Sequence, residues 1–300
     1  MAIKVGLEGM PPLALAAARF GIGWVVVAAA AAVTRQPIAL DAGEWKPLAG
    51  LCLLFVVQIA TLNIGTLHTS ASRSIVLISA YPTDSGVIIV NSPGSGEFKD
   101  GRHDRWMKLA RHLQEGGLAT MVTYNAPRPD WQVQLPWEPY SHKGASWNQL
   151  LVESLAHVVE FSLERASELC GSSSPVVYLS GFSSGGSAVG AVAFRYEEIK
   201  RILLLSAYDS VGDYFYEGIT RFTGDIYMAF GSQDQMAGLL AYVVRCGPMA
   251  ANSLRVREVP DCDHRFSGAT NSKVLSKAFA WAFQDDETFP SPEGGLQLYE

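Results

Sequence analysis

The sequence predicts an α/β fold in which a parallel sheet is flanked by helices, preceded by two helices of transmembrane type. Two observations support this prediction. After residue 86, short apolar runs typical of buried strands alternate with segments that place apolar residues at helical spacing. Before that residue, long apolar runs hold almost no charge. The chain is therefore predicted to comprise a membrane segment (1–82), an α/β domain (83–287) and a flexible, Pro- and Gly-rich tail (288–300).

The first predicted elements are two membrane spans. Residues 12–33 are mostly apolar with Arg19 as their only charge, and residues 48–67 hold no charge. An α-helix rises 1.5 Å per residue, so a run of about 20 residues crosses a hydrocarbon core about 30 Å thick. Pro37 and Gly43 lie in the polar stretch between the runs and indicate a connecting loop. A buried helical hairpin of a soluble protein is the structural alternative.

Six later runs have the length and composition of strands. Each is short and rich in aliphatic residues, as the buried strands of a parallel sheet are. They lie at 86–94, 118–125, 176–181, 201–207, 225–231 and 253–259. Ile75–Ser79 is a further short candidate.

Apolar residues at helical spacing predict the elements between these strands. Trp106, Leu109, Ala110 and Leu113 recur at i, i+3, i+4 and i+7. The stretch 126–146 is rich in proline and aromatic residues, which predicts a long loop. Further helices are predicted at 147–170, at 184–193, around 239–243 and around 275–282.

Charge and cysteine content exclude several functional classes. The formal net charge of −6 argues against nucleic-acid binding, which requires a basic face. The four cysteines form no C-x-x-C pair, so neither a metal site nor a cofactor is predicted. Two interpretations of the cysteines remain: free thiols without a role, and a disulfide between Cys246 and Cys262.

The motif that indicates chemistry is Gly181-Phe182-Ser183-Ser184-Gly185, which matches G-x-S-x-G. The pentapeptide directly follows an apolar strand and directly precedes a helix of small residues, which is the strand-turn-helix context of a nucleophile elbow. Such a turn holds the serine backbone in a strained conformation, and small flanking residues avoid collisions there. Ser183 is therefore the candidate nucleophile.

A serine hydroxyl needs a base to take its proton, and the base needs an acid to orient it. In this motif's context the chain order is Ser, then acid, then His. Asp234 follows the predicted strand at 225–231, and His264 follows the last predicted strand. The other five histidines precede the nucleophile, so only His264 has the required order.

Alternatives remain for the acid and the base. Asp209 and Asp213 follow the fourth predicted strand, which is another position for the acid. Asp261 and Asp263 lie too near His264 in sequence to orient its ring easily. Each residue also has a non-catalytic interpretation. Asp234 would then be a carboxylate that caps a turn, and His264 an ordinary loop histidine.

The motifs GFSSGG, GSQD and DCDHRF, in this order, resemble the α/β-hydrolase superfamily over residues 86–285. The resemblance implies a serine hydrolase that cleaves small carboxylic esters through an acyl-enzyme. It further implies an oxyanion hole formed by the backbone N–H of Ser184 and one N–H from the loop 91–96. Pro93 has no N–H, so Gly94 or Ser95 is the second candidate donor.

The chain departs from the family pattern in two places. Asn91-Ser92 stands where the family usually has His-Gly, and the opening antiparallel hairpin is replaced by other sequence.

The stretch 209–224 is too short for a cap domain. An open cleft is therefore expected, shaped by aromatic residues that could instead simply pack their loops: Trp131, Trp137, Tyr140, Tyr214, Phe215 and Tyr216.

MAIKVGLEGMPPLALAAARF and LNIGTLHTSASRSIVLISAYP resemble the EamA-type drug/metabolite transporter family, through Pro11-Pro12 before Arg19 and a Ser-rich stretch from Ser70 to Pro82. The match covers residues 1–82, whereas the family has ten membrane helices in two repeats, and one fragment cannot form a site between repeats. The resemblance implies a segment that contacts the lipid bilayer and a membrane location, or a cytoplasmic location if the segment is a gene-fusion artefact. A transporter fragment joined to a catalytically silent hydrolase-like domain is the alternative function.

Overall fold

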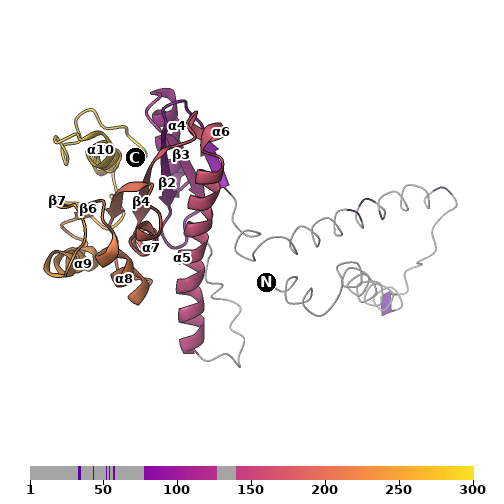
Figure 1. Ribbon diagram of the computed structural model, residues 1–300, viewed down its shortest axis with the longest axis horizontal. Coiled ribbons are helices and arrows are strands. Elements are labelled where there is room, and N and C mark those ends of the chain that lie inside the picture. The colour runs from indigo at the N-terminus through magenta and orange to yellow at the C-terminus, as the bar shows by residue number, and fades with distance from the viewer. Residues whose placement is uncertain are drawn as a thin grey trace. The chain divides into compact units, whose positions relative to one another are not determined.

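The computed structural model describes residues 78–126 and 140–300, with side chains from 147 onward in the second range, and six isolated residues before 78. The chain divides into two compact units, residues 1–75 and 76–300. Helices surround a sheet in the second unit, which holds all the labelled elements (Figure 1).

Seven strands form one sheet in the order β1-β3-β2-β4-β5-β6-β7. β1 pairs antiparallel with β3, and every other neighbouring pair is parallel. Because β3 and β4 flank β2 on opposite sides, the carboxyl end of β2 is a topological switch point, where open α/β sheets bind ligands. The strands are Ile78–Tyr81 (β1), Val87–Ser92 (β2), Thr120–Tyr124 (β3), Val176–Phe182 (β4), Ile199–Leu205 (β5), Asp225–Gly231 (β6) and Ser253–Val259 (β7).

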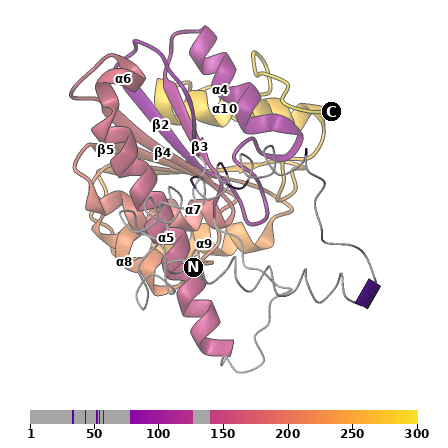
Figure 2. The ribbon, with the colours of Figure 1, turned by 90° about the vertical axis from the view of Figure 1, so that its right-hand side faces the viewer.

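Helices cover both faces of the sheet, as Figure 2 shows. Successive residues of a strand point to opposite faces, so Ile88 and Val90 pack with α5, α7, α8 and α9, whereas Ile89 packs with α4 and α10. These two clusters of buried side chains form the core on either side of the sheet. The helices are Arg105–Glu115 (α4), Tyr140–Glu164 (α5), Ala166–Cys170 (α6), Ser184–Val192 (α7), Asp213–Arg221 (α8), Gln235–Cys246 (α9) and Ala269–Gln284 (α10), with short 3₁₀ turns at Arg102–Asp104 (η1) and Ala193–Arg195 (η2).

The predicted parallel sheet flanked by helices is confirmed, and the six predicted strands agree with the structure to within two residues at each end. The helix predicted at 147–170 is instead two helices, because the chain breaks at Arg165, and its first half begins earlier, at Tyr140. The end of the stretch 126–146, predicted to be a loop, is therefore helical.

Helix α8 occupies the stretch 209–224, for which the sequence analysis predicts no helix. Two glycines, Gly212 and Gly218, weaken the helical signal there because glycine disfavours helix. Tertiary packing explains the second of them. A Cβ at Gly218 would lie 2.2 Å from the carbonyl oxygen of Gly190, so α8 can approach α7 this closely only with glycine.

No helix in the part of the chain that the structure describes combines the length and apolarity needed to cross a membrane. The spans predicted at 12–33 and 48–67 lie outside the described residues, apart from four single positions. The resemblance of residues 1–82 to the EamA-type family therefore also falls mostly outside the described residues.

The last residues pack against the α/β unit, although their composition predicts a flexible tail at 288–300. Leu298 is fully buried, and Lys108 Nζ donates a hydrogen bond to its carbonyl at 2.7 Å. The Tyr299 hydroxyl donates to the carbonyl of Phe266 at 2.8 Å. Proline and glycine content correctly indicates irregular backbone, but it does not reveal that the apolar residues at the end of the segment find a place in the core.

Candidate active site

Ser183 lies at the sharp bend between β4 and α7, next to the switch point at the end of β2. Its backbone has φ 56° and ψ −121°, a region that non-glycine residues adopt only at an energetic cost. The flanking glycines are required by close approach. A Cβ at Gly181 would lie 2.4 Å from the Gly185 carbonyl oxygen, and one at Gly185 would lie 2.2 Å from that of Ser92. Strain at a serine with such neighbours is the geometry of a nucleophile elbow.

The structure brings Ser183, His264 and Asp234 into one hydrogen-bonded chain. His264 Nδ1 lies 2.7 Å from Asp234 Oδ2, and His264 Nε2 lies 3.0 Å from Ser183 Oγ. An ionised carboxylate only accepts hydrogen bonds, so Nδ1 carries the hydrogen and Nε2 presents a lone pair to the serine hydroxyl. A catalytically silent domain is expected to hold Ser183 and His264 beyond hydrogen-bond distance of each other. The structure instead has them within that distance.

Backbone contacts fix the distance between Asp234 and His264. The turn after β6 and the loop after β7 touch, because Gln233 N donates to the Cys262 carbonyl at 3.0 Å. A Cβ at Gly231 would lie 2.0 Å from the same carbonyl oxygen, so only glycine allows the two segments to meet. Asp234 and His264 are thus positioned by the main chain as well as by their own hydrogen bond.

The carboxylate of Asp234 lies in an environment that keeps it ionised. Asp234 is 6% exposed, and its side chain caps α9 by accepting a hydrogen bond from Ala237 N at 3.3 Å. Burial alone raises the pKa of Asp234, but the hydrogen bonds from His264 and Ala237 and the attraction of the His264 ring outweigh it, so the net pKa is lowered. The capping role therefore coexists with contact to His264.

The rival acids make other contacts. Asp209 is exposed and accepts a hydrogen bond from the Tyr216 hydroxyl at 3.0 Å. Asp213 is exposed in the first turn of α8. Asp263 accepts hydrogen bonds from the Ser267 hydroxyl and from two backbone amides of its own loop. Of the acids weighed, only Asp234 bonds to His264.

The candidate oxyanion donors lie on the same side as the nucleophile. Ser184 is the first residue of α7, and a helix leaves its first four N–H groups without internal partners. Gly94 and Ser95 line the same pocket as Ser183. Gly185 packs against the carbonyls of Ser92 and Pro93, which holds this loop against the elbow.

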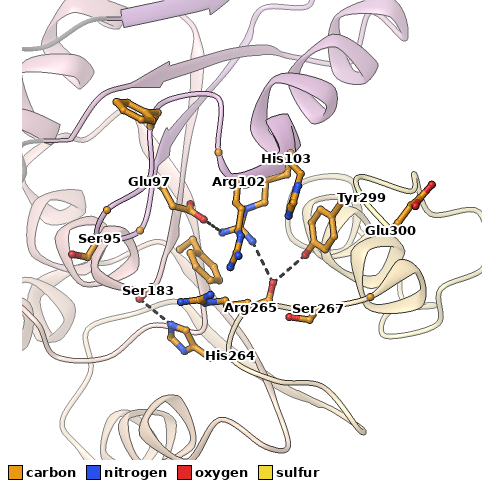
Figure 3. Close-up of a pocket in the computed structure, with 17 residues that line it drawn as sticks. Ser95, Glu97, Arg102, His103, Ser183, His264, Arg265, Ser267, Tyr299 and Glu300 are labelled. Carbon is orange, nitrogen blue, oxygen red and sulfur yellow. Dashed lines mark hydrogen bonds and ion pairs between the residues drawn. The ribbon is translucent and has the colours of Figure 1, made fainter.

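A pocket of about 660 Å³ opens beside Ser183 and His264 (Figure 3). Of the aromatic side chains predicted to shape the cleft, the three that the structure describes do not line it. Phe215 is fully buried in the core, and Tyr214 and Tyr216 lie elsewhere on α8, while Trp131, Trp137 and the side chain of Tyr140 fall outside the described residues. The lining comes from the loop after β2, η1, the His264 loop and the C-terminal residues: Gly94 to Phe98, Gly101 to His103, Arg105, Phe182, Ser183, His264, Arg265, Ser267, Gly268, Tyr299 and Glu300.

Arg105 is the central buried charge of this pocket, at 2% exposure. Its Nη2 lies 2.6 Å from Glu97 Oε1, and its Nη1 donates to the Arg265 carbonyl at 3.3 Å. Its guanidinium also stacks 4.1 Å from the ring centroid of Phe182, whose ring lies 5.5 Å from that of His264. Trp106 Nε1 donates to the second oxygen of Glu97 at 3.1 Å.

The charged lining of the pocket was not predicted, although the sequence holds two signals of it. Arg105 lies four residues before Leu109 and eight before Leu113, so it is a charge within the apolar stripe of its helix, and buried charges require partners. Arg265 directly follows His264, so any site that contains the base has this side chain nearby.

The cysteines and acidic groups offer no site for a metal among the described residues. No group of three or more His, Cys, Asp or Glu side chains there is placed to hold an ion.

All four cysteines are free, so the disulfide considered between Cys246 and Cys262 is absent. Burial and the nearby carboxylates of Asp263 and Asp234 raise the pKa of Cys262 to about 12.

Comparison with solved structures identifies the fold. A dienelactone hydrolase from Anabaena variabilis superposes with a TM-score of 0.53 at 14% identity, over 69% of this chain and 92% of that one. Mouse α/β hydrolase domain-containing protein 10 matches with a TM-score of 0.47 at 11% identity, over 68% of this chain and 92% of that one. A monoacylglycerol lipase from Paleococcus ferrophilus matches with a TM-score of 0.46 at 13% identity, over 63% of this chain and 90% of that one. The sequence itself matches no protein-family model and no curated protein. The likeness to the dienelactone hydrolase, with the sheet order and its flanking helices, shows an α/β-hydrolase fold.

Proposed function

We propose that this protein is a serine hydrolase that cleaves carboxylic esters through an acyl-enzyme intermediate. The observation that carries the proposal is the 3.0 Å separation between Ser183 Oγ and His264 Nε2, at a strained bend that exposes the hydroxyl to a pocket. A hydroxyl within reach of an oriented imidazole is the arrangement that acyl transfer requires. The fold supports the same reaction class, since the dienelactone hydrolase that shares it is named for cleaving a cyclic ester.

The proposed reaction has two halves. The Ser183 oxygen attacks the ester carbonyl while its proton passes to His264 Nε2, and Asp234 stabilises the resulting imidazolium. The tetrahedral oxyanion accepts hydrogen bonds from the N–H of Ser184 and from that of Gly94 or Ser95. Collapse expels the alcohol, which takes the proton from His264. Water then gives a proton to the same imidazole, attacks the acyl-enzyme, and releases the acid and the free serine.

A fluorophosphonate probe tests the nucleophile directly, because it forms a covalent bond only with an activated serine. The wild-type protein is expected to be labelled, and Ser183→Ala is expected to lose both labelling and hydrolysis of short p-nitrophenyl esters. Ser173→Ala, at an exposed serine away from the pocket, is the matched control and retains both activities. Labelling that persists in Ser183→Ala would refute the assignment.

Anchoring of the hydrolase by residues 1–82 is a separate part of the proposal, and it rests on the two long apolar runs of the sequence. Extraction of cell membranes with alkaline carbonate tests it. Full-length protein that stays in the pellet supports an integral anchor, whereas protein released into the supernatant contradicts it.

A further inference from the structure

Positively charged side chains gather on the wall of the pocket that holds Ser183 and His264. Arg102, Arg105 and Arg265 all line it, together with His103. The two carboxylate side chains on the same wall belong to Glu97 and Glu300. Figure 3 shows Arg102 and His103 on η1 and Arg265 on the His264 loop around this pocket. Their charges differ in whether a partner already neutralises them.

Arg105 is neutralised, whereas Arg102 and Arg265 are not. Both oxygens of Glu97 are occupied, one by Arg105 and the other by Trp106. Arg102 and Arg265 form no ion pair with any carboxylate among the described residues. Two cations in one pocket are therefore available to a ligand.

Two of the acids nearest to these arginines in sequence have other partners, whereas Asp104, two residues after Arg102, is exposed and forms no ion pair among the described residues. Asp263, two residues before Arg265, gives its carboxylate to Ser267 and to backbone amides. Asp100, two residues before Arg102, pairs with Lys99 at 2.8 Å. Glu300 is exposed at the rim and is the one lining carboxylate outside the Arg105 ion pair.

The main chain of Arg265 is fixed, which gives its side chain a defined origin. Its carbonyl accepts a hydrogen bond from Arg105 Nη1 at 3.3 Å, and its N–H donates to Asp263 at 3.1 Å. The same carbonyl lies 3.0 Å from the Tyr299 hydroxyl, whose one hydrogen it shares with the Phe266 carbonyl. Figure 3 shows the side chain extending from the His264 loop toward Ser183. This orientation places a cation in the same pocket as the Ser183 hydroxyl.

We propose that the pocket selects esters that carry a carboxylate, which Arg265 and Arg102 bind while the ester carbonyl lies at Ser183. This inference rests on the hydrolase function proposed above. A guanidinium offers a planar pair of N–H donors that matches the two oxygens of a carboxylate. Two uncompensated guanidinium groups also attract an anionic substrate toward the pocket before contact.

Matched pairs of esters test the preference. Mono-p-nitrophenyl glutarate and p-nitrophenyl 5-methylhexanoate have the same acyl shape, but only the first carries a carboxylate. 3-(4-Acetoxyphenyl)propanoate and its methyl ester place the charge on the alcohol side instead. In at least one pair, kcat/KM for the anionic ester is expected to exceed that for the neutral one by about tenfold or more, the effect of one or two charge-assisted hydrogen bonds. Added salt should reduce that ratio, because both arginines are exposed.

Substitutions then identify the groups responsible. Arg265→Gln and Arg102→Gln are each expected to lower the anionic-to-neutral ratio by about tenfold. The ratio cancels any general effect of the substitution on folding or on His264. Arg245→Gln, at an exposed arginine of α9 away from the pocket, is the control and keeps the wild-type ratio.

Each outcome separates the two proposals. A ratio near one in both pairs for the wild type, or a ratio that survives both pocket substitutions, overturns the carboxylate preference and leaves the hydrolase intact. Absence of both ester turnover and fluorophosphonate labelling refutes the hydrolase function, and the preference with it.

Discussion

The Arg105 guanidinium and the Glu97 carboxylate form a buried ion pair, 2.6 Å apart, that connects three parts of the site. Glu97 lies in the loop that holds the candidate oxyanion donors, Arg105 begins α4, and the second hydrogen bond of Arg105 ends on the loop that carries His264. Both charges have little access to water, since their side chains are 2% and 15% exposed. The pair therefore couples the stability of the domain to the geometry of its pocket.

Removing one member of this pair is expected to be costly. Arg105→Met keeps most of the volume of the side chain but leaves the part-buried Glu97 without its cation, and breaking a fully buried pair costs about 3–5 kcal/mol, which is the upper bound here. Urea unfolding of the full chain measures the loss. Arg221→Met, which breaks the exposed pair with Glu217, is the control and should cost about 1 kcal/mol or less. A loss below about 1 kcal/mol for Arg105→Met would contradict the role of a buried pair.

Asp234→Asn is expected to lower kcat for an ester by about 10⁴-fold, the loss known for this change in a serine–histidine–aspartate triad. The reason is tautomeric, because an amide that donates to Nδ1 forces the hydrogen onto Nε2, which can then no longer take the serine proton. Steady-state kinetics on p-nitrophenyl esters measure the effect. Asp209→Asn, which removes the rival acid, should retain wild-type kcat, and a comparable loss there would point to the wrong acid.

The lowered pKa of Asp234 predicts how stability depends on pH. A carboxyl whose folded pKa lies below its unfolded value, about 3.9, stabilises the protein above that value and loses the contribution as pH falls toward the folded pKa. The free energy of unfolding of the wild type should therefore fall more steeply below about pH 4 than that of Asp234→Asn. Denaturant titrations of both proteins between about pH 6 and pH 3 provide the comparison. Parallel curves would contradict it.

The cysteines should differ in reactivity. Cys246 is exposed, whereas Cys262 is buried with its pKa raised to about 12, so little thiolate forms near neutral pH. Iodoacetamide at about pH 8 is expected to modify Cys246 in the native protein and to leave Cys262 and the buried Cys170 unmodified. In urea all three should react. Peptide mass spectrometry reads each site, and native modification of Cys262 would show that its loop opens.

Local sequence pattern was sufficient for the parts of the fold that depend on burial alone. Strands such as β6 and β7 are short apolar runs whose bounds agree with their prediction, and the bend at Ser183 follows from its glycines. The chain order of Ser183, Asp234 and His264 led to three residues that the structure places within hydrogen-bond distance. Their catalytic roles remain predictions.

What could not be predicted depends on contacts between distant segments. The pocket wall combines residues near 95–105 with residues near 300, and no local pattern relates the two. Likewise, the hydrogen bond between Arg105 and the Arg265 carbonyl spans 160 positions. Helix α8 was missed because its glycine is explained only by the neighbouring helix. In each case a partner that is remote in sequence determines the outcome.

The docking of the final residues beside the site has a practical consequence for handling the protein. Because Leu298 is inserted in the core and Tyr299 and Glu300 line the pocket, any residues fused after Glu300 begin at the wall of the pocket that holds Ser183. A purification tag attached there would bring its own volume and charges to this pocket. Kinetic constants from such a preparation would describe the fusion, so a removable tag placed elsewhere is the appropriate design.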